Sequence, residues 1–134
     1  MIFTDFAQSE AFRMHAPKWA FAPTSGEGAA QHGGRVNRPG VAALYLALDS
    51  GTAIREYQQD DPLVPPGTLV SYRITVDRIL DFRGGFQSDQ WPPVWEDFFC
   101  DWRSILLDQG VEPPSWAIGD DASSCSHPRR PRAA

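Results

Sequence analysis

Three side chains that could do chemistry together lie within one stretch of the chain, residues 25–57: Arg35, Tyr45 and Glu56. A guanidinium can hold a phosphate or a carboxylate through two parallel hydrogen bonds, a phenol can stack or hydrogen-bond, and a carboxylate can stabilise developing positive charge. Arg35 follows two glycines, which allow the backbone to approach a ligand closely. The stretch therefore predicts a nucleotide pocket. The competing interpretation is a loop arginine paired with a surface acid, since a glycine pattern alone is weak.

The tyrosine lies in an apolar run, residues 41–48, with the sequence VAALYLAL and turn residues before and after it. A run of this length is typical of a central strand that is buried on both faces. Tyr45 is its one member with a polar tip, and a buried tyrosine hydroxyl usually finds a partner. Tyr45 is predicted either to line a pocket or to be a core residue bonded to the backbone.

The carboxylate lies on a short predicted helix, residues 51–59, for which Asp49 or Ser50 can serve as the N-cap. The helix has one apolar stripe, and Glu56 lies at the edge of it. Glutamates in such places are mostly solvated. Spacing alone therefore does not make Glu56 catalytic.

Other elements must position these side chains. The patterns predict strands at residues 11–14, 69–76 and 79–82, and helices over residues 92–108 and 116–122. Aromatic residues of the first of these helices, Trp95 and Phe99 among them, are predicted to be core. Together with the run at residues 41–48, the elements predict one α+β domain, with a central antiparallel or mixed sheet and flanking helices.

Composition and charge exclude several function classes. The chain has 134 residues, of which 42% are hydrophobic, and its net charge is −5 although three arginines lie close to its end. The acidic body argues against direct nucleic-acid binding. No apolar run is long enough for a membrane span and no leader pattern is recognised, so we expect a cytoplasmic protein. Cys100 and Cys125 do not have the spacing of a metal site, and we expect no metal.

Several motifs in a fixed order resemble the RES-domain family, which is named for an arginine, a glutamate and a serine. They are FR at residues 12–13, SGEGA at 25–29, GGRVN at 33–37, RPG at 38–40, ALYLAL at 43–48 and TAIREY at 52–57. Shorter matches extend the similarity as far as residue 122. Several motifs in one order are far more specific than any one of them.

The resemblance implies a fold similar to that of ADP-ribosyltransferases and the function of a toxin of a type II toxin–antitoxin system. Such toxins consume NAD by cleaving its nicotinamide–ribose bond. On the matching positions, Arg13 and Arg35 would hold the NAD diphosphate, Tyr45 would line the nicotinamide side, and Glu56 would stabilise the oxocarbenium-like ribose. Nicotinamide leaves as a neutral molecule, so no general acid is needed.

The resemblance leaves the acceptor of the ADP-ribosyl group open. Inorganic phosphate would make the enzyme an NAD phosphorylase, water a glycohydrolase, and a protein side chain a mono-ADP-ribosyltransferase with a protein target. The implied partner is an antitoxin protein with a helix-turn-helix part, which blocks the entrance to the active site. The sequence does not identify the surface that the antitoxin contacts.

The end of the chain departs from the family pattern. RES domains continue into an apolar strand that carries the family serine, whereas residues 123–134 are rich in proline and arginine and cannot form a central strand. We expect a RES-like domain over residues 1–122 and a divergent, disordered tail over residues 123–134, and we transfer the serine role to none of the serines there. A frameshift or truncation is our hypothesis for this tail. The alternatives to an active toxin are a catalytically defective relative that only binds its antitoxin or a nucleotide, and a nucleotide-binding module with no toxin role.

Overall fold

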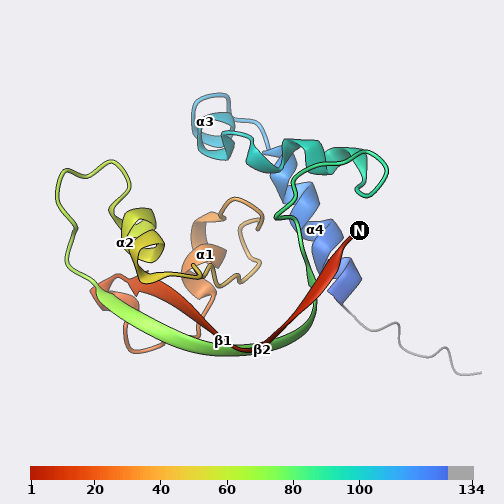
Figure 1. Cartoon of the computed structure of the whole chain (residues 1–134). Coiled ribbons are helices and arrows are strands. Elements are labelled where there is room, and N and C mark those ends of the chain that lie inside the picture. Colours follow the sequence, from red (N-terminus) through yellow and green to blue (C-terminus); the bar gives the residue numbers. More distant parts are fainter. Residues whose placement is uncertain (127–134) are drawn as a thin grey trace, which may run out of the picture.

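The computed structural model describes residues 1–126, which form a curved antiparallel pair of strands with helices on its concave side (Figure 1). The expected α+β class is therefore confirmed. Strand β1, Phe3–His15, pairs with β2, Thr68–Leu80, in a register that places His15 opposite Thr68 and Phe3 opposite Leu80. Within the described residues the sheet has these two strands alone, whereas the sequence predicted a larger one.

The strands bend sharply where their pairing slips. Gln8 and Arg78 have positive φ, 50° and 57°, and register shifts interrupt the start of β1. Side chains replace the lost ladder bonds: Thr75 Oγ1 accepts from the Gln8 N–H at 3.0 Å, and Asp5 Oδ1 accepts from the Arg78 N–H at 2.8 Å. Such bulges increase curvature without ending the strand. They explain why the sequence predicted two strands where β2 is continuous.

The predicted buried strand at residues 41–48 is wrong. The segment meets β1 at one bridge, in which Phe12 and Ala47 exchange backbone hydrogen bonds of 2.7 and 2.8 Å. Val41 and Leu48 remain 46% and 58% exposed. An apolar run becomes a central strand only when strands flank it on both sides, and the described residues offer it only the edge of β1.

The 3₁₀ helix η1, Pro17–Trp19, follows the end of β1, and two α-helices lie over the C-terminal half of that strand: α1, Glu27–His32, and α2, Ser50–Gln58 (Figure 1). The last of them confirms the helix predicted at residues 51–59. It begins after Asp49, whose carboxylate accepts from the Thr52 N–H at 2.7 Å. Ala53 is buried where α2 packs on β1.

The other helical segments gather at the opposite end of the sheet: η2, Pro93–Phe99, α3, Trp102–Leu107, and α4, Pro114–Ser126 (Figure 1). The sequence predicted one helix over residues 92–108, and this prediction is wrong. Cys100 is extended, with ψ of 153°, and Asp101 starts a new helix by accepting from the Ser104 N–H at 3.2 Å. An aspartate in this place favours an N-cap over a helix interior.

The core at this end is aromatic. Trp91, Trp95 and Ile118 are buried, and the ring of Phe82 contacts both tryptophans. Trp95 confirms its prediction as a core residue, whereas Phe99 is 75% exposed and does not. Because η2 is a 3₁₀ helix with about three residues per turn, Phe99 at its end does not have the position that a continuous α-helix would have given it.

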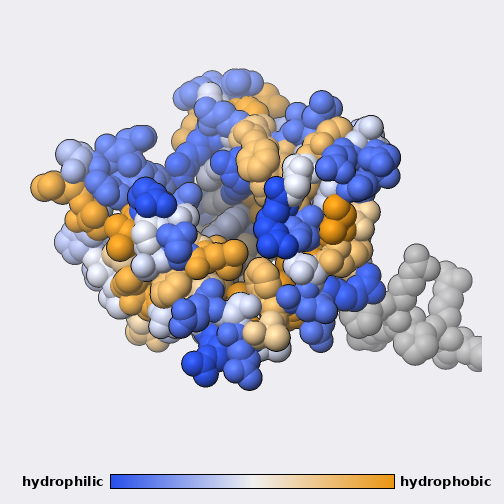
Figure 2. All heavy atoms as spheres, viewed as in Figure 1, coloured by the Kyte–Doolittle hydropathy of each residue, from blue (hydrophilic) through white to orange (hydrophobic). Residues whose placement is uncertain are grey.

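Helix α4 continues to Ser126, past the end expected for the RES-like domain at residue 122. That boundary stays a prediction, and residues 127–134 of the expected tail lie outside the described residues. None of the described helices is long and apolar enough to cross a membrane. Figure 2 shows that the viewed face is hollowed between the side that carries α2 and the side that carries α3.

Candidate active site

A cavity of about 220 Å³ lies over the C-terminal half of β1, where η1, α1 and α2 meet. Residues Arg13 and His15 line it from β1, and they share one face of the strand because they are two positions apart. Trp19, Gly28 and Tyr57 line it from the three helical segments. This cavity combines a cation, an imidazole and aromatic walls. A second hollow of about 400 Å³ beside α1 is shallower and is lined by no arginine.

Arg13 is anchored at one nitrogen. Its Nη1 donates to the backbone carbonyl of Tyr45 at 2.8 Å, while its Nε is buried without a hydrogen-bond partner. Its Nη2 makes no hydrogen bond within residues 1–126. The guanidinium is thus oriented by the 41–48 segment, and Nη2 is the donor that an anion in the cavity could use.

His15 lines the cavity, although it was not predicted as a site residue. It is 5% exposed, and its Nε2 lies 2.5 Å from the hydroxyl of Tyr72, which also reaches the carbonyl of Pro23. Burial lowers the pKa of His15 below 6.5, and the nearby charge of Arg13 lowers this pKa further. The one clue in the sequence is its spacing. His15 lies two positions after Arg13, so both side chains share one face of β1.

Arg35 does not line the cavity. Its Nη1 donates to the carbonyl of Cys100 at 3.0 Å and to that of Phe98 at 3.3 Å, so that its charge caps the C-terminal end of η2. Ser115 Oγ donates to the carbonyl of Arg35 itself. The alternative of a surface ion pair also does not hold, because the partners are backbone carbonyls. Both hydrogen bonds use one nitrogen, which leaves Nε and Nη2 without a partner in the described residues.

The hydroxyl of Tyr45 makes two hydrogen bonds within the protein. It donates to Asn37 Oδ1 at 2.6 Å and accepts from the Val36 N–H at 3.1 Å. Burial raises its pKa, although the charges of Arg35 and Arg13 oppose that rise. The Tyr45 hydroxyl is therefore held by one side chain and one backbone amide, whereas the sequence offered a core tyrosine bonded to backbone or a pocket residue, and its role in binding a ligand stays a prediction.

Glu56 is exposed on α2 and has no hydrogen-bond or ion-pair partner within the described residues. It does not line the cavity, whereas the next residue, Tyr57, does. The Tyr57 hydroxyl donates to the carbonyl of Pro66 at 2.6 Å. Of the four residues predicted for the site, the structure joins Arg13 and Tyr45 by a hydrogen bond and places Glu56 and Arg35 at separate positions.

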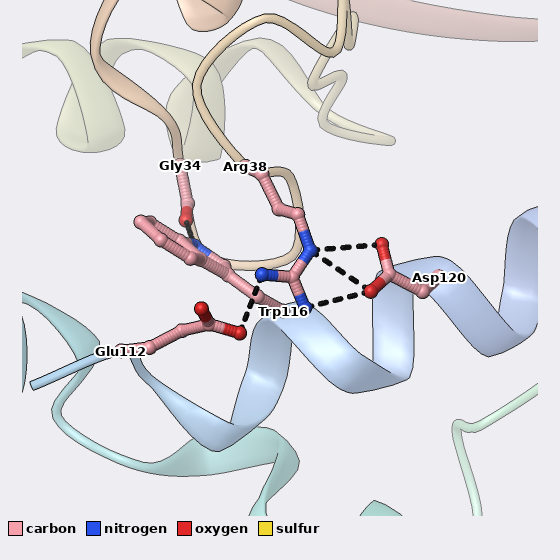
Figure 3. A network of polar contacts seen from close by, with 5 residues as sticks. All are labelled: Gly34, Arg38, Glu112, Trp116 and Asp120. Atoms are coloured by element: carbon pink, nitrogen blue, oxygen red, sulfur yellow. Dashed lines mark hydrogen bonds and ion pairs between the residues drawn. The ribbon is translucent and has the colours of Figure 1, made fainter.

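The glycine-rich loop, residues 33–40, is clamped to α4 (Figure 3). Arg38 donates to Asp120 through Nε, at 2.9 Å, and to Glu112 through Nη1. Trp116 Nε1 donates to the carbonyl of Gly34 at 2.7 Å. In the sequence Arg38 stands out only as part of the RPG motif, because partners more than 70 positions away leave no local pattern. The clamp fixes the loop that carries Arg35.

The comparison with protein families gives one result. The family of the RES domain matches residues 10–128, which is most of the chain. No curated protein and no solved structure matches the chain. The match includes the strand residue Arg13, the clamped loop and the α2 helix described above. This chain belongs to the RES-domain family.

Proposed function

We propose that the chain is a toxin of a type II toxin–antitoxin system that cleaves NAD at the nicotinamide–ribose bond. The RES domain is associated with toxins of toxin–antitoxin pairs that act on NAD. The observation that carries the proposal is the cavity over β1, which is lined by the aromatic side chains of Trp19 and Tyr57 and by Arg13, whose Nη2 has no hydrogen-bond partner in the described residues.

The proposed binding mode uses the chemistry of these walls. Arg13 holds the diphosphate by charge-assisted hydrogen bonds, and the rings of Trp19 and Tyr57 pack on the flat parts of the dinucleotide. Gly28 supports such a mode because it faces the ring of Trp19 without a side chain of its own. Arg35 and Tyr45 act from the clamped loop, with the free nitrogens of Arg35 adding positive charge.

The proposed reaction breaks the bond between C1′ of the ribose and the nicotinamide nitrogen. The electron pair of that bond stays with the nicotinamide, which leaves neutral, and positive charge builds on the ribose. We assign the stabilisation of this positive charge to the carboxylate of Glu56. Phosphate, water or a protein side chain then takes the ADP-ribosyl group, and we leave these three acceptors open. Glu56 is exposed and lies outside the cavity. In this proposal the ribose therefore lies at the rim of the cavity, beside α2.

The partner in this proposal is an antitoxin protein with a helix-turn-helix part that blocks the cavity entrance. We place the pair in the cytoplasm, where NAD is available. A protein acceptor of ADP-ribose would be a second, transient partner.

The experiment is to incubate the purified full chain with NAD and to identify the products, with and without phosphate. Arg13→Gln should lose most of the NAD-consuming activity because it removes the charged donors from the cavity. Arg73→Gln is a matched control, since Arg73 is an exposed arginine of β2. Activity that is equal in Arg13→Gln and wild type would contradict the assignment of the cavity.

A second candidate is a catalytically defective relative that binds its antitoxin or a nucleotide without turnover. The exposed position of Glu56, outside the cavity, favours it. A folded chain that binds NAD and leaves it intact is the result that supports this candidate over the first.

A further inference from the structure

The cavity over β1 offers two kinds of polar group. Arg13 can only donate hydrogen bonds, because a guanidinium has no acceptor. His15 can accept one if the ring nitrogen that faces a ligand carries no proton. The position of the imidazole proton therefore decides what the cavity recognises.

Tyr72 fixes that proton. Its hydroxyl oxygen lies 2.5 Å from His15 Nε2 and also contacts the carbonyl oxygen of Pro23. A carbonyl oxygen can only accept, so the single phenolic proton goes to Pro23 and the Tyr72 oxygen must accept from His15 Nε2–H. A neutral imidazole with its proton on Nε2 has a bare lone pair on Nδ1. Within residues 1–126, Nδ1 makes no hydrogen bond.

The surroundings keep this ring neutral. Burial and the charge of Arg13 lower the pKa of His15 below 6.5. The titratable groups beside it are Arg13 from its own strand, Tyr72 from β2 and Tyr57 from α2, and the described residues that line the cavity include no carboxylate. His15 therefore acts as a neutral acceptor around neutral pH.

We infer that His15 is a positioning residue of the cavity, whose Nδ1 accepts a hydrogen bond from a ribose hydroxyl of the substrate while Arg13 holds the adjacent phosphate. Side chains two positions apart on a strand lie about 7 Å apart on one face. One sugar phosphate can bridge that spacing. The inference rests on the proposed function for the identity of the whole substrate, but the sugar phosphate follows from this pair of groups.

The test compares ribose 5-phosphate with methyl phosphate at about pH 8, where both are dianions and only the sugar has hydroxyl donors. We expect wild type to bind ribose 5-phosphate about three- to tenfold more tightly, the value of one added hydrogen bond. His15→Phe should bring the ratio of the two dissociation constants to about one and leave methyl phosphate binding unchanged. The exposed His32→Phe should keep the wild-type ratio. An unchanged ratio in His15→Phe, or no preference in wild type, overturns the inference.

Nitrogen NMR of the wild-type protein tests the same point without a variant. The His15 ring should show the Nε2–H tautomer, and its Nδ1 resonance should shift with ribose 5-phosphate but not with methyl phosphate. Tyr72→Phe should mix the tautomers and weaken the preference for the sugar. An Nδ1–H tautomer in the free protein overturns the inference.

The NAD assay separates this inference from the proposed function. If wild type prefers ribose 5-phosphate through His15 but leaves NAD intact, the proposed function fails and the ligand assignment stands. If wild type and His15→Phe consume NAD with the same kcat and KM, the proposed function stands and the role of His15 is overturned.

Discussion

Gly119 of α4 packs against the backbone of Val36 so closely that a Cβ at position 119 would lie 1.6 Å from the Val36 carbonyl oxygen. No neighbouring side chain can yield to relieve that contact, because the clash is with backbone. Gly119 and Val36 are more than 80 positions apart in sequence, so α4 and the glycine-rich loop are docked at their main chains. The contact with α4 therefore fixes the backbone next to Arg35.

The first prediction is that Gly119→Ala destabilises the fold. In an exposed helix, changing glycine to alanine would stabilise the protein by about 1 kcal/mol. A loss of stability would therefore point to a steric clash at position 119. We expect a loss of roughly 1–3 kcal/mol from overpacking, measured by urea unfolding followed through tryptophan fluorescence. Gly84→Ala is the control, since its Cβ would meet only the end of Gln87, at 3.9 Å. A stabilised Gly119→Ala would contradict the docking of α4 on the loop.

The second prediction concerns the clamp arginine. Arg38→Lys loses the fork that reaches Asp120 and Glu112 together, since an ammonium cannot bind two carboxylates in that geometry. We expect a lower urea midpoint and a reduced salt dependence of that midpoint. Arg83→Lys, which alters a pair with Asp81 only two positions away, should change the midpoint less because it joins no distant elements. Equal effects of the two changes would show that the clamp stabilises the fold no more than a local ion pair does.

The third prediction is for the arginine of the loop. Arg35→Met leaves the carbonyls of Phe98 and Cys100 without their charged donor, and hydrogen bonds to charged groups contribute about 1.5–3 kcal/mol each. We expect a free energy of unfolding lower by about 2 kcal/mol, with Arg35→Lys in between. If Arg35→Met keeps full stability and loses only NAD turnover, the capping role is wrong and a purely ligand-binding role replaces it.

The fourth prediction is a pH dependence of stability from His15. Its pKa in the folded state is below the unfolded value of 6.5, so the unfolded chain takes up the proton first as pH falls. The contribution to stability is complete above pH 6.5 and is lost as pH falls through the folded pKa. Unfolding free energies between about pH 8 and about pH 5 should fall less in His15→Phe than in wild type, while His32→Phe should match wild type. A pH slope that is the same in all three proteins would contradict the account.

The sequence predicted the parts of the fold that rest on local pattern. Alternation predicted strands at residues 69–76 and 79–82, which together make up most of β2, and Asp49 was one of two N-cap residues predicted for α2. It failed where the outcome depends on what lies beside a segment: residues 41–48 have the composition of a central strand but no second neighbour, and Asp101 divides a run whose apolar spacing suits one helix.

The candidate site shows the same division. Motifs identified Arg13, Arg35, Tyr45 and Glu56, but they could not show that Arg35 caps η2 or that the hydroxyl of Tyr45 is used by Asn37. His15 was missed because its role depends on Tyr72, a residue on another strand. Contacts between residues far apart in the sequence cannot be predicted from the local spacing of residue types.

The most direct test of the central claim is NAD consumption by the purified chain beside Glu56→Gln, with Glu10→Gln as the control for an exposed carboxylate of β1. The account predicts that wild type and Glu10→Gln release nicotinamide, and that Glu56→Gln is slower by about a hundredfold or more, because an amide does not stabilise the charged ribose. Nicotinamide release by Glu56→Gln at the wild-type rate would contradict the account.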